Sequence, residues 1–399
     1  MQLNNIMKLL DLPDIIATDL IQHENLYVFI AEHRKKSAVC PDCGAHSNKI
    51  HDSRWQNIKD IPIRNKEVII RLKKNRYRCS KCGKRGFSQE YKSIEDYARK
   101  TKRYDKYLVN EATNRDYSNV SRENNLSYTS IKNAVKNHVD PIIQKRIREN
   151  ISNLETISID EFAVVKHHKY AVVISDPVNK EIVDILDSRK KEYLIKYFMS
   201  WTKEQRAKVK IFSMDMWSPY KSVAKTVFPN AKIVVDKFHL VAKMNKALDE
   251  IRKKVQNEVG DISRKKFYMS RKLLKKRGED LKEKDHQKLI KLFKISPALE
   301  KAWELKEEFR DLLQMNDVND AKNALQCWYQ RVSDYKLTPF YNAKKTVKRW
   351  EQKIINYFKT GITNGFAEGI NNKIKLIKRI GYGVPNIHNL KRRVFMSVV

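Results

Sequence analysis

Residues 156–186 read TISIDEFAVVKHHKYAVVISDPVNKEIVDIL, and this stretch decides the fold. A His-Lys turn and an Asp-Pro turn divide it into three β-rich runs, which are 156–165, 170–175 and 181–186. Downstream, the hydrophobic pattern alternates between the two kinds of element, with a helix over 193–201, a strand over 209–214, a helix over 220–228 and a strand over 231–235. The chain therefore passes from an antiparallel meander to alternating helices and strands.

That order of elements predicts a ribonuclease H-like arrangement, which is a mixed sheet with helices on its faces. Asp160 ends the first expected strand and Asp215 ends the fourth, and these strands are neighbours in such a sheet. We expect the two carboxylates side by side, where their mutual repulsion implies a cation. Cutting a nucleic-acid backbone needs a neutralised phosphate and an activated water, and two divalent ions held by carboxylates supply both.

A third acid lies on the last expected helix, which runs from Thr363 or Asn364, either of which can cap it, to about Arg379. One side of this helix is apolar, and the other side carries Glu368, Asn371, Asn372, Lys375 and Arg379. Glu368 could complete a set of three metal ligands. A plain solvated helix face is the alternative.

Other acids compete for the same role. Glu161 and Asp236 lie near the same strand ends, whereas Asp176 and Asp184 are expected in a turn and on the surface. Asp236 and His239 could support the metal ligands through hydrogen bonds, or they could form a purely structural pair.

Four of the five cysteines form two Cys-x-x-Cys pairs, which are Cys40 with Cys43 and Cys79 with Cys82. A glycine follows each pair, where a tight knuckle needs room, and four thiolates suit one tetrahedral zinc ion. In a reducing compartment such pairs favour a metal over disulfides. We expect one structural Zn²⁺.

Two further features belong to this cysteine region. The spacer between the pairs is longer than in most zinc ribbons, but it contains strand-like residues such as 68–72. His46 and His51 are alternative ligands that two complete pairs make unnecessary. Cys327 stands alone on an expected helix, where we expect it to pack as a small apolar side chain.

The charge balance points to a polyanionic partner. Lys and Arg number 82 against 47 Asp and Glu, which gives a formal net charge of +35. The cations are spread along the chain and interleaved with aromatic residues, which favours nucleic acid over a ribosome-type or membrane-surface protein. Phosphate contacts are expected from cations near the second cysteine pair and on the last helix, namely Arg71, Lys73, Lys74, Arg76, Arg78, Lys375 and Arg379.

The start of the chain lacks the basic segment and the cleavage site of a signal peptide, and no window approaches the roughly 18 apolar residues of a membrane span. We therefore expect a cytoplasmic, nucleoid-associated protein without membrane contact.

These patterns predict a multidomain α+β protein with five segments. Residues 104–147 are mainly helical, and a turn at Leu126-Ser127 before the helix over 128–139 is typical of a helix-turn-helix. The segments are 1–90, a zinc-ribbon DNA-binding region; 91–150, the helix-turn-helix; 151–239, the first part of a ribonuclease H-like α/β catalytic domain; 240–360, a helical insertion; and 361–399, the final helix and carboxyl-terminal end of that domain.

The sequence resembles the ISL3 family of insertion-sequence transposases, which have an Asp-Asp-Glu triad. The resemblance covers nearly the whole chain, and the segments that carry it are 40–44 (CPDCG), 159–162 (IDEF), 214–220 (MDMWSPY), 228–231 (FPNA), 236–239 (DKFH), 368–375 (EGINNKIK), 378–379 (KR) and 381–383 (GYG). Together these motifs are specific, although each alone would be weak.

The resemblance implies that Asp160, Asp215 and Glu368 form a catalytic triad that holds two Mg²⁺ or Mn²⁺ ions. It also implies recognition of the inverted repeats at an element's ends, followed by strand cleavage and strand transfer on double-stranded DNA. Because two ends must be paired, a homodimer is expected. The alternatives are a catalytically inert DNA-binding regulator derived from a transposase, and a ribonuclease or resolvase on the same fold.

Overall fold

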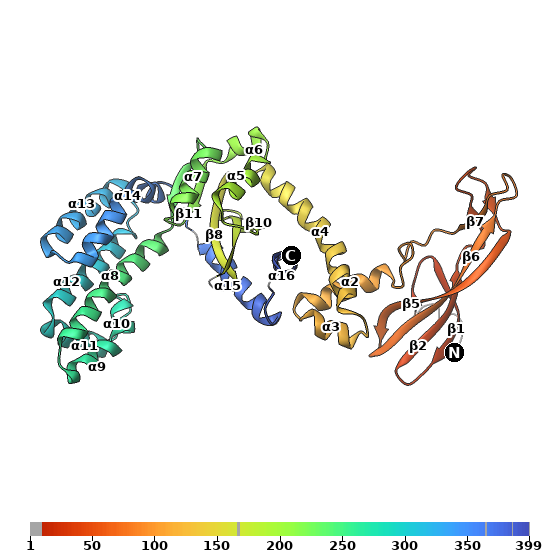
Figure 1. The fold of residues 1–399 in the computed structure, drawn as a ribbon, viewed down its shortest axis with the longest axis horizontal. Coiled ribbons are helices and arrows are strands. Elements are labelled where there is room, and N and C mark those ends of the chain that lie inside the picture. The colour runs from red at the N-terminus through yellow and green to blue at the C-terminus, as the bar shows by residue number, and fades with distance from the viewer. Residues whose placement is uncertain (1–9, 166–167, 364, 385, 399) are drawn as a thin grey trace. The chain divides into compact units, whose positions relative to one another are not determined.

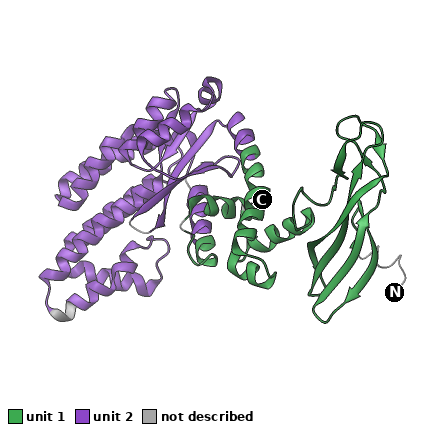
Figure 2. Ribbon diagram, turned by 45° about the vertical axis from the view of Figure 1, so that its right-hand side comes forward, with its two compact units in different colours: residues 1–145, 376–399 green, residues 146–375 purple. Residues whose placement is uncertain are grey.

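The computed structural model describes residues 10–165, 168–363, 365–384 and 386–398, without the side chains of 261–263 and 398 (Figure 1). Asn364, one of the two expected helix caps, and part of the His-Lys turn lie outside the described residues. The chain forms two compact units, which are residues 1–145 with 376–399 and residues 146–375 (Figure 2). The boundaries between them fall inside helices, so the five predicted segments stay predictions.

The first unit holds a five-stranded sheet in the order β1-β2-β6-β5, with β7 paired to β6. The strands are β1 (Ile15–Gln22), β2 (Leu26–His33), β5 (Ile50–Ile63), β6 (Lys66–Arg78) and β7 (Arg85–Ser88). The sequence analysis overlooked β1 and β2. Arg64 and Asn65 join β5 to β6 and have φ of 51° and 62°. A two-residue hairpin turn of type I′ requires such positive φ values at both residues.

One face of this sheet is buried and the other is open. Phe29, Ile58, Ile70 and Leu72 point into a core and are fully buried, and each such side chain contributes about 1.5–3 kcal/mol through burial. Alternation of buried and half-buried residues along β2 leaves the opposite face uncovered. At the end of the sheet, β3 (Ala38–Val39) and β4 (His46–Ser47) form a small ribbon beside the cysteines.

The rest of the first unit is helical, as expected, and comprises α2 (Lys102–Thr113), α3 (Tyr117–Glu123), α4 (Tyr128–Ser152) and α16 (Ile387–Val398). The helix expected to be the last one, α15 (Gly365–Ile380), is followed by α16, so that expectation was wrong. Leu390 and Val394 bury its apolar side. Arg392 binds both carboxylate oxygens of Asp140 on α4, at 2.6 and 2.8 Å, which attaches α16 to this unit.

The second unit contains a five-stranded sheet in the order β10-β9-β8-β11-β12. Its strands are β8 (Thr156–Val165), β9 (Lys169–Asp176), β10 (Glu181–Leu186), β11 (Ile211–Met214) and β12 (Lys232–Val235). The first three strands are antiparallel, and β8, β11 and β12 are parallel. The sequence therefore predicted both the strands and the adjacency of the first and fourth.

Helices surround this sheet. Those near it are α5 (Lys191–Met199), α6 (Lys203–Lys208), which was not expected, α7 (Ser218–Val227) and α15 (Gly365–Ile380). The predicted helical insertion consists of α8 (Lys237–Glu258), α9 (Asp261–Met269), α10 (Arg271–Lys275), α11 (Glu283–Ile295), α12 (Pro297–Leu312), α13 (Val318–Tyr335) and α14 (Thr338–Thr360). Asn356 on α14 donates to the Ile233 carbonyl of β12 at 2.8 Å, so the insertion packs directly on the sheet edge.

The expectations for Cys327 and Asp184 were wrong, whereas Asp176 begins a turn as expected but is buried. Cys327 is exposed on α13 and does not pack in a core. Asp176 and Asp184 are buried, because Asp176 accepts the backbone N–H groups of its own turn and Asp184 accepts a hydrogen bond from the Tyr197 hydroxyl at 2.9 Å. Among the described residues, no helix has both the length and the apolar character that a membrane crossing requires.

Candidate active site

Three aspartates lie level with one another along three adjacent parallel strands: Asp160 is on β8, and Asp215 and Asp236 directly follow β11 and β12. Ile211 pairs with Thr156 of β8 and with Lys232 of β12. When that register is continued by four residues, Asp215 falls level with Asp160 on one side and with Asp236 on the other. The structure thus brings together the two aspartates predicted as ligands, and it places beside them Asp236, which the sequence named as a competing acid.

Asp160 differs in one respect from the expectation. It does not end its strand, because β8 continues to Val165. The parallel pairing with β11 stops at Ser158, and beyond that point β8 pairs with β9 alone. Asp160 therefore sits where β11 leaves β8, and this opening gives its side chain access to Asp215.

His239 lies in the first turn of α8, next to this row. Asp236 caps that helix by accepting the Phe238 N–H at 3.2 Å, and His239 Nε2 lies 2.8 Å from Asp215 Oδ1. One ligand atom from each of Asp215, Asp236 and His239 lies within 4.8 Å of the others, so this group can hold a metal ion. The hydrogen bond to Asp215 raises the pKa of His239.

Asn371 on α15 fixes the other aspartate. Its Nδ2 donates to Asp160 Oδ2 at 2.7 Å, and Asn371 is buried. The sequence analysis placed Asn371 on a polar helix side without saying what that side contacts. The structure shows that this part of the side faces the sheet, so the helix that carries Glu368 is held against β8.

Burial raises the pKa of Asp160 to about 7, and the negative charge of Asp215 adds to this effect. A carboxyl group with this pKa is only partly ionised at neutral pH, and a cation between the two aspartates would favour the ionised form. The electrostatics of the row therefore fit a divalent ion.

Glu161, an alternative ligand from the sequence, is engaged elsewhere. Both of its carboxylate oxygens lie 2.8 Å from Arg189 Nη1, and the Arg189 guanidinium also stacks over the rings of Tyr170 and Trp217. This pairing argues against Glu161 as a metal ligand.

Glu368 lies in the first turn of α15, one turn before Asn371, and is exposed. It opens onto a cavity of about 310 Å³ that Asp236 also lines. Among the described residues, Glu368 is not a member of the metal-capable group of Asp215, Asp236 and His239. The structure thus places Glu368 near Asp236 without joining it to the two aspartates.

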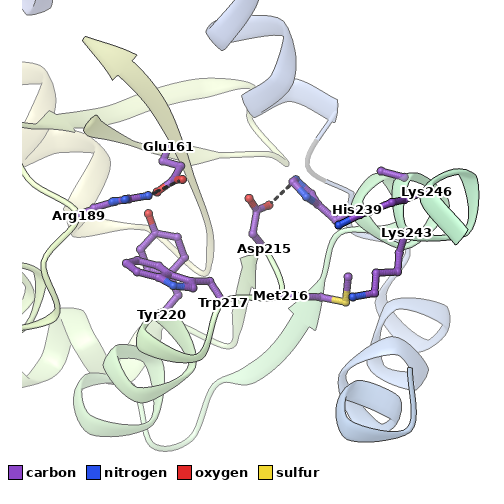
Figure 3. Close-up of a pocket in the computed structure, with 10 residues that line it drawn as sticks. Glu161, Arg189, Asp215, Met216, Trp217, Tyr220, His239, Lys243 and Lys246 are labelled. Atoms are coloured by element: carbon purple, nitrogen blue, oxygen red, sulfur yellow. Dashed lines mark hydrogen bonds and ion pairs between the residues drawn. The ribbon is translucent and has the colours of Figure 1, made fainter. Parts of the chain in front are cut away.

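A second cavity, of about 440 Å³, opens beside Asp215. Figure 3 shows Asp215 between the Arg189–Glu161 pair on one side and His239, Lys243 and Lys246 on the other. The two lysines follow His239 on the same face of α8. The sequence analysis missed them, although spacings of four and seven residues from His239 are a usable signal.

Tyr220 also lines this cavity and was not singled out from the sequence. Its side chain is buried, and its hydroxyl has no hydrogen-bond partner within the described part of the chain. Burial raises the pKa of Tyr220, and the nearby carboxylates, Glu161 first, raise it further. The hydroxyl therefore stays protonated and can donate to a bound group.

The four cysteines form one cluster in the first unit. Cys40 and Cys82 have their sulfurs 3.6 Å apart, as do Cys43 and Cys79, and ligand atoms of all four lie within 4.8 Å of one another. A tetrahedral zinc ion with Zn–S bonds of about 2.3 Å needs sulfurs about 3.8 Å apart. The backbone N–H groups of Cys82 and Lys81 lower the pKa of Cys79, whereas burial and the neighbouring thiols raise the pKa of Cys82, so a thiolate forms first at Cys79.

Glycines shape the knuckles of this cluster, as the sequence predicted. Gly44 and Gly83 follow the second cysteine of each pair and have φ of 71° and 78°. Gly44 also donates its N–H to the Cys40 carbonyl at 3.0 Å. This left-handed backbone conformation strains other residues, so a side chain at either position would open the knuckle.

The cations predicted to bind phosphate are distributed as follows. Arg71, Arg76 and Arg78 are exposed on β6, Lys73 and Lys74 are half-buried, and Lys375 and Arg379 are exposed on α15. Arg76 forms an ion pair with Asp52 at 3.2 Å. Their contact with DNA stays a prediction.

Comparison with known proteins gave consistent matches. The model of an ISL3-type transposase family matches residues 157–394. The model of the zinc finger of the transposases IS204, IS1001, IS1096 and IS1165 matches residues 36–82.

Individual relatives are similar over much of the chain. A transposase for insertion sequence element IS1001 from Bordetella parapertussis is 25% identical over 352 residues, which cover 87% of this chain and 86% of the relative. Transposases for element IS1557 from two strains of Mycobacterium tuberculosis are 27% identical over 263 residues, which cover 60% of this chain and 59% of each relative.

The raised pKa of Asp160 predicts a pH-dependent stability. In protein freed of Mg²⁺ and Mn²⁺ at pH 8, we expect Asp160→Asn to increase the free energy of unfolding by about 1–2 kcal/mol, because it removes a carboxylate charge that burial and Asp215 disfavour. The folded state binds this proton more tightly than the unfolded state, so the wild type loses stability as pH rises from about 4 to 7. The mutant's advantage should therefore vanish near pH 4. Urea titrations between pH 4 and 8 measure the free energy of unfolding, with the exposed Asp334→Asn as the control variant. An equal gain in stability for Asp160→Asn at pH 4 and pH 8 would contradict the raised pKa of Asp160.

The cysteine cluster predicts one zinc ion per chain. We expect Cys43→Ser to lose the metal and to increase hydrogen exchange in β3, β4 and β7, because binding of the metal supplies folding free energy to this small region. Elemental analysis of purified protein gives the zinc content. Cys327→Ser is the matched control and should keep its zinc; equal zinc in both variants would exclude this cluster as the site.

Proposed function

This chain belongs to the ISL3 family of insertion-sequence transposases, and we propose that it binds the terminal inverted repeats of its element and catalyses metal-dependent cleavage and transfer of DNA strands. The family membership rests on the match over residues 157–394. The observation that carries the chemistry is the level placement of Asp160 and Asp215, with the helix of Glu368 held against Asp160 by Asn371.

The catalytic unit is, in this proposal, a ribonuclease H-like domain with an insertion. The strand order β10-β9-β8-β11-β12, with three antiparallel strands followed by parallel ones, supports it. We further propose that α3 and α4 act as a helix-turn-helix, with Asp116 capping α3 and a short turn before Tyr128.

Asp160, Asp215 and Glu368 would hold two Mg²⁺ or Mn²⁺ ions, which neutralise the phosphate and activate the attacking water or 3′-hydroxyl. Neighbouring residues would orient the side chains of the triad. Asn371 orients Asp160 by donating a hydrogen bond, and His239 orients Asp215 from the other side. Glu368 shares a cavity with Asp236, which is level with Asp215, so a rotation of its long side chain is the movement this proposal requires.

Other residues would bind the DNA itself. Lys243, Lys246 and the unpartnered hydroxyl of Tyr220 line the cavity beside Asp215 and can contact phosphate oxygens on either side of the cut. Lys375, Arg379 and the cations of β6 would bind DNA phosphates. A zinc ion in the cysteine cluster would keep the end of the β6 surface rigid. Because two ends must be joined to one target, a homodimer is part of the proposal.

A cleavage and joining assay tests this function. The DNA should carry the terminal repeats that flank the gene, and the products with Mg²⁺ are sequenced. We expect nicks at the repeat ends and joining of the new 3′ ends to other DNA. Asp160→Asn, Asp215→Asn and Glu368→Gln should each lower both activities by at least about 10²–10³-fold, because each removes charge stabilisation at the phosphate.

Two controls make the outcomes distinct. Glu192→Gln changes an exposed glutamate on α5 and should leave both activities unchanged. Asp236→Asn tests whether the third carboxylate is Asp236. If Glu368→Gln cuts normally and Asp236→Asn does not, the triad is misassigned. If the wild type binds the repeats without any Mg²⁺-dependent cutting, the protein is a DNA-binding regulator; cutting without joining would indicate a nuclease or resolvase.

A further inference from the structure

The open face of the sheet in the first unit bears a groove with an unusual composition. It encloses about 1060 Å³ and crosses β2, β6 and β5 to the segment that follows β7. Arg54, Arg71 and Arg99 line it together with two aromatic residues, Trp55 and Tyr97. The lining residues that the structure describes include no Asp or Glu. The lining therefore carries positive charge and aromatic rings but no acid; Asp96, the neighbour of Tyr97, is outside it.

The aromatic side chains in this groove are exposed to an extent that the protein's own packing does not explain. Trp55 is 50% exposed and Tyr97 is 90% exposed. Large aromatic residues normally bury most of their surface, so two of them on one face indicate a binding surface. The Arg71 guanidinium lies over the Trp55 ring at 5.6 Å, which places a cation beside an aromatic face.

The wall formed by Tyr97 and Arg99 is held in place by the backbone. Lys59 of β5 donates its N–H to the Arg99 carbonyl at 2.9 Å, and Gln56 Nε2 donates to the Ala98 carbonyl at 3.2 Å. Tyr97 has φ of 59°, a conformation that is uncommon for a large side chain and persists where the surroundings enforce it. The segment is thus fixed along the edge of β5, and it directs an aromatic ring to solvent.

We propose that this groove binds single-stranded DNA, with bases stacked on Trp55 and Tyr97 and phosphates paired with Arg54, Arg71 and Arg99. Arginines without acids select a polyanion, and exposed aromatic faces select a polyanion that also presents flat rings. Only unpaired bases present such rings, because the bases of a duplex are stacked on each other. The inference rests on the proposed function only in taking DNA as the partner.

The experiment measures binding of a fluorescein-labelled 12-nucleotide oligothymidine to the full zinc-containing chain, by anisotropy and without Mg²⁺. Trp55→Ala with Tyr97→Ala should weaken binding by about tenfold or more, since stacking accounts for a large share of affinity for single strands. Arg54→Gln with Arg99→Gln should lower the slope of log affinity against log salt by about 1.4 and leaves the aromatic pair intact. Tyr268→Ala, which changes a 70% exposed tyrosine on α9, is the control and should bind normally.

Photo-crosslinking locates the strand even if a variant fails to fold. With 5-iododeoxyuridine in the oligonucleotide, we expect crosslinks in the tryptic peptides 55–59 and 93–99 of the wild type. Crosslinks confined to other peptides would overturn the proposal. A 20-base-pair duplex, tested in parallel, should be affected much less by loss of the aromatic pair; an equal loss would show that the groove binds duplex backbone instead.

These outcomes are separate from those of the cleavage assay. Wild-type protein that binds the oligonucleotide in the groove but cuts no DNA would refute the proposed function and leave this inference standing. Protein that cuts and joins element ends, but shows no groove crosslinks, would refute this inference alone.

Discussion

The register between β8, β11 and β12 is the constraint on which the candidate site depends. Parallel pairing runs up to Ser213 with β8 and up to Met214 with β12, and it leaves Asp160, Asp215 and Asp236 level with one another just beyond the paired residues. A one-residue slip in either pairing would turn an aspartate to the opposite face of the sheet. Three carboxylates in a half-buried row repel one another. The fold can hold them only because Asn371, His239 and the cap of α8 each satisfy one of them.

The insertion between β12 and α15 supports that row from one side. Its helices and the sheet share one hydrophobic core, in which Trp328, Phe340 and Trp350 are buried together with strand residues such as Phe212. A close-packed core of this kind is hardly compressible, so it holds the insertion and the sheet in one fixed arrangement. It also explains how α15 returns to β8 after a long helical excursion, because α14 is packed on β12 just before α15 begins.

The sequence predicted the catalytic sheet well because its strands are short apolar runs between turn residues, and a level pair of aspartates follows from their order. It predicted the cysteine cluster for a similar reason, since metal ligands repeat at fixed spacing. The predictions from sequence failed for polar residues that are buried. Asn371 and Asp184 are buried although they are polar, because each forms a hydrogen bond within the protein. A helix or strand pattern cannot distinguish such a residue from one that contacts water. β2 was overlooked because LYVFIAEH is apolar at almost every position, which hides the alternation seen in the structure.

Asp236 and Glu368 are the two candidates for the third metal-binding carboxylate, and they differ in the contacts that hold their side chains. Asp236 is short, is buried, and already accepts the Phe238 N–H as the cap of α8, so turning it toward a cation between Asp160 and Asp215 would weaken that helix start. Glu368 has a longer side chain, is exposed, and lies in the first turn of α15, where the helix dipole favours negative charge. Its helix is fixed one turn later by the bond from Asn371 to Asp160, which keeps the first turn of α15, and with it Glu368, close to β8. Glu368 can therefore approach a cation at little loss elsewhere, whereas Asp236 is better suited to hold the start of α8, and with it His239, against Asp215.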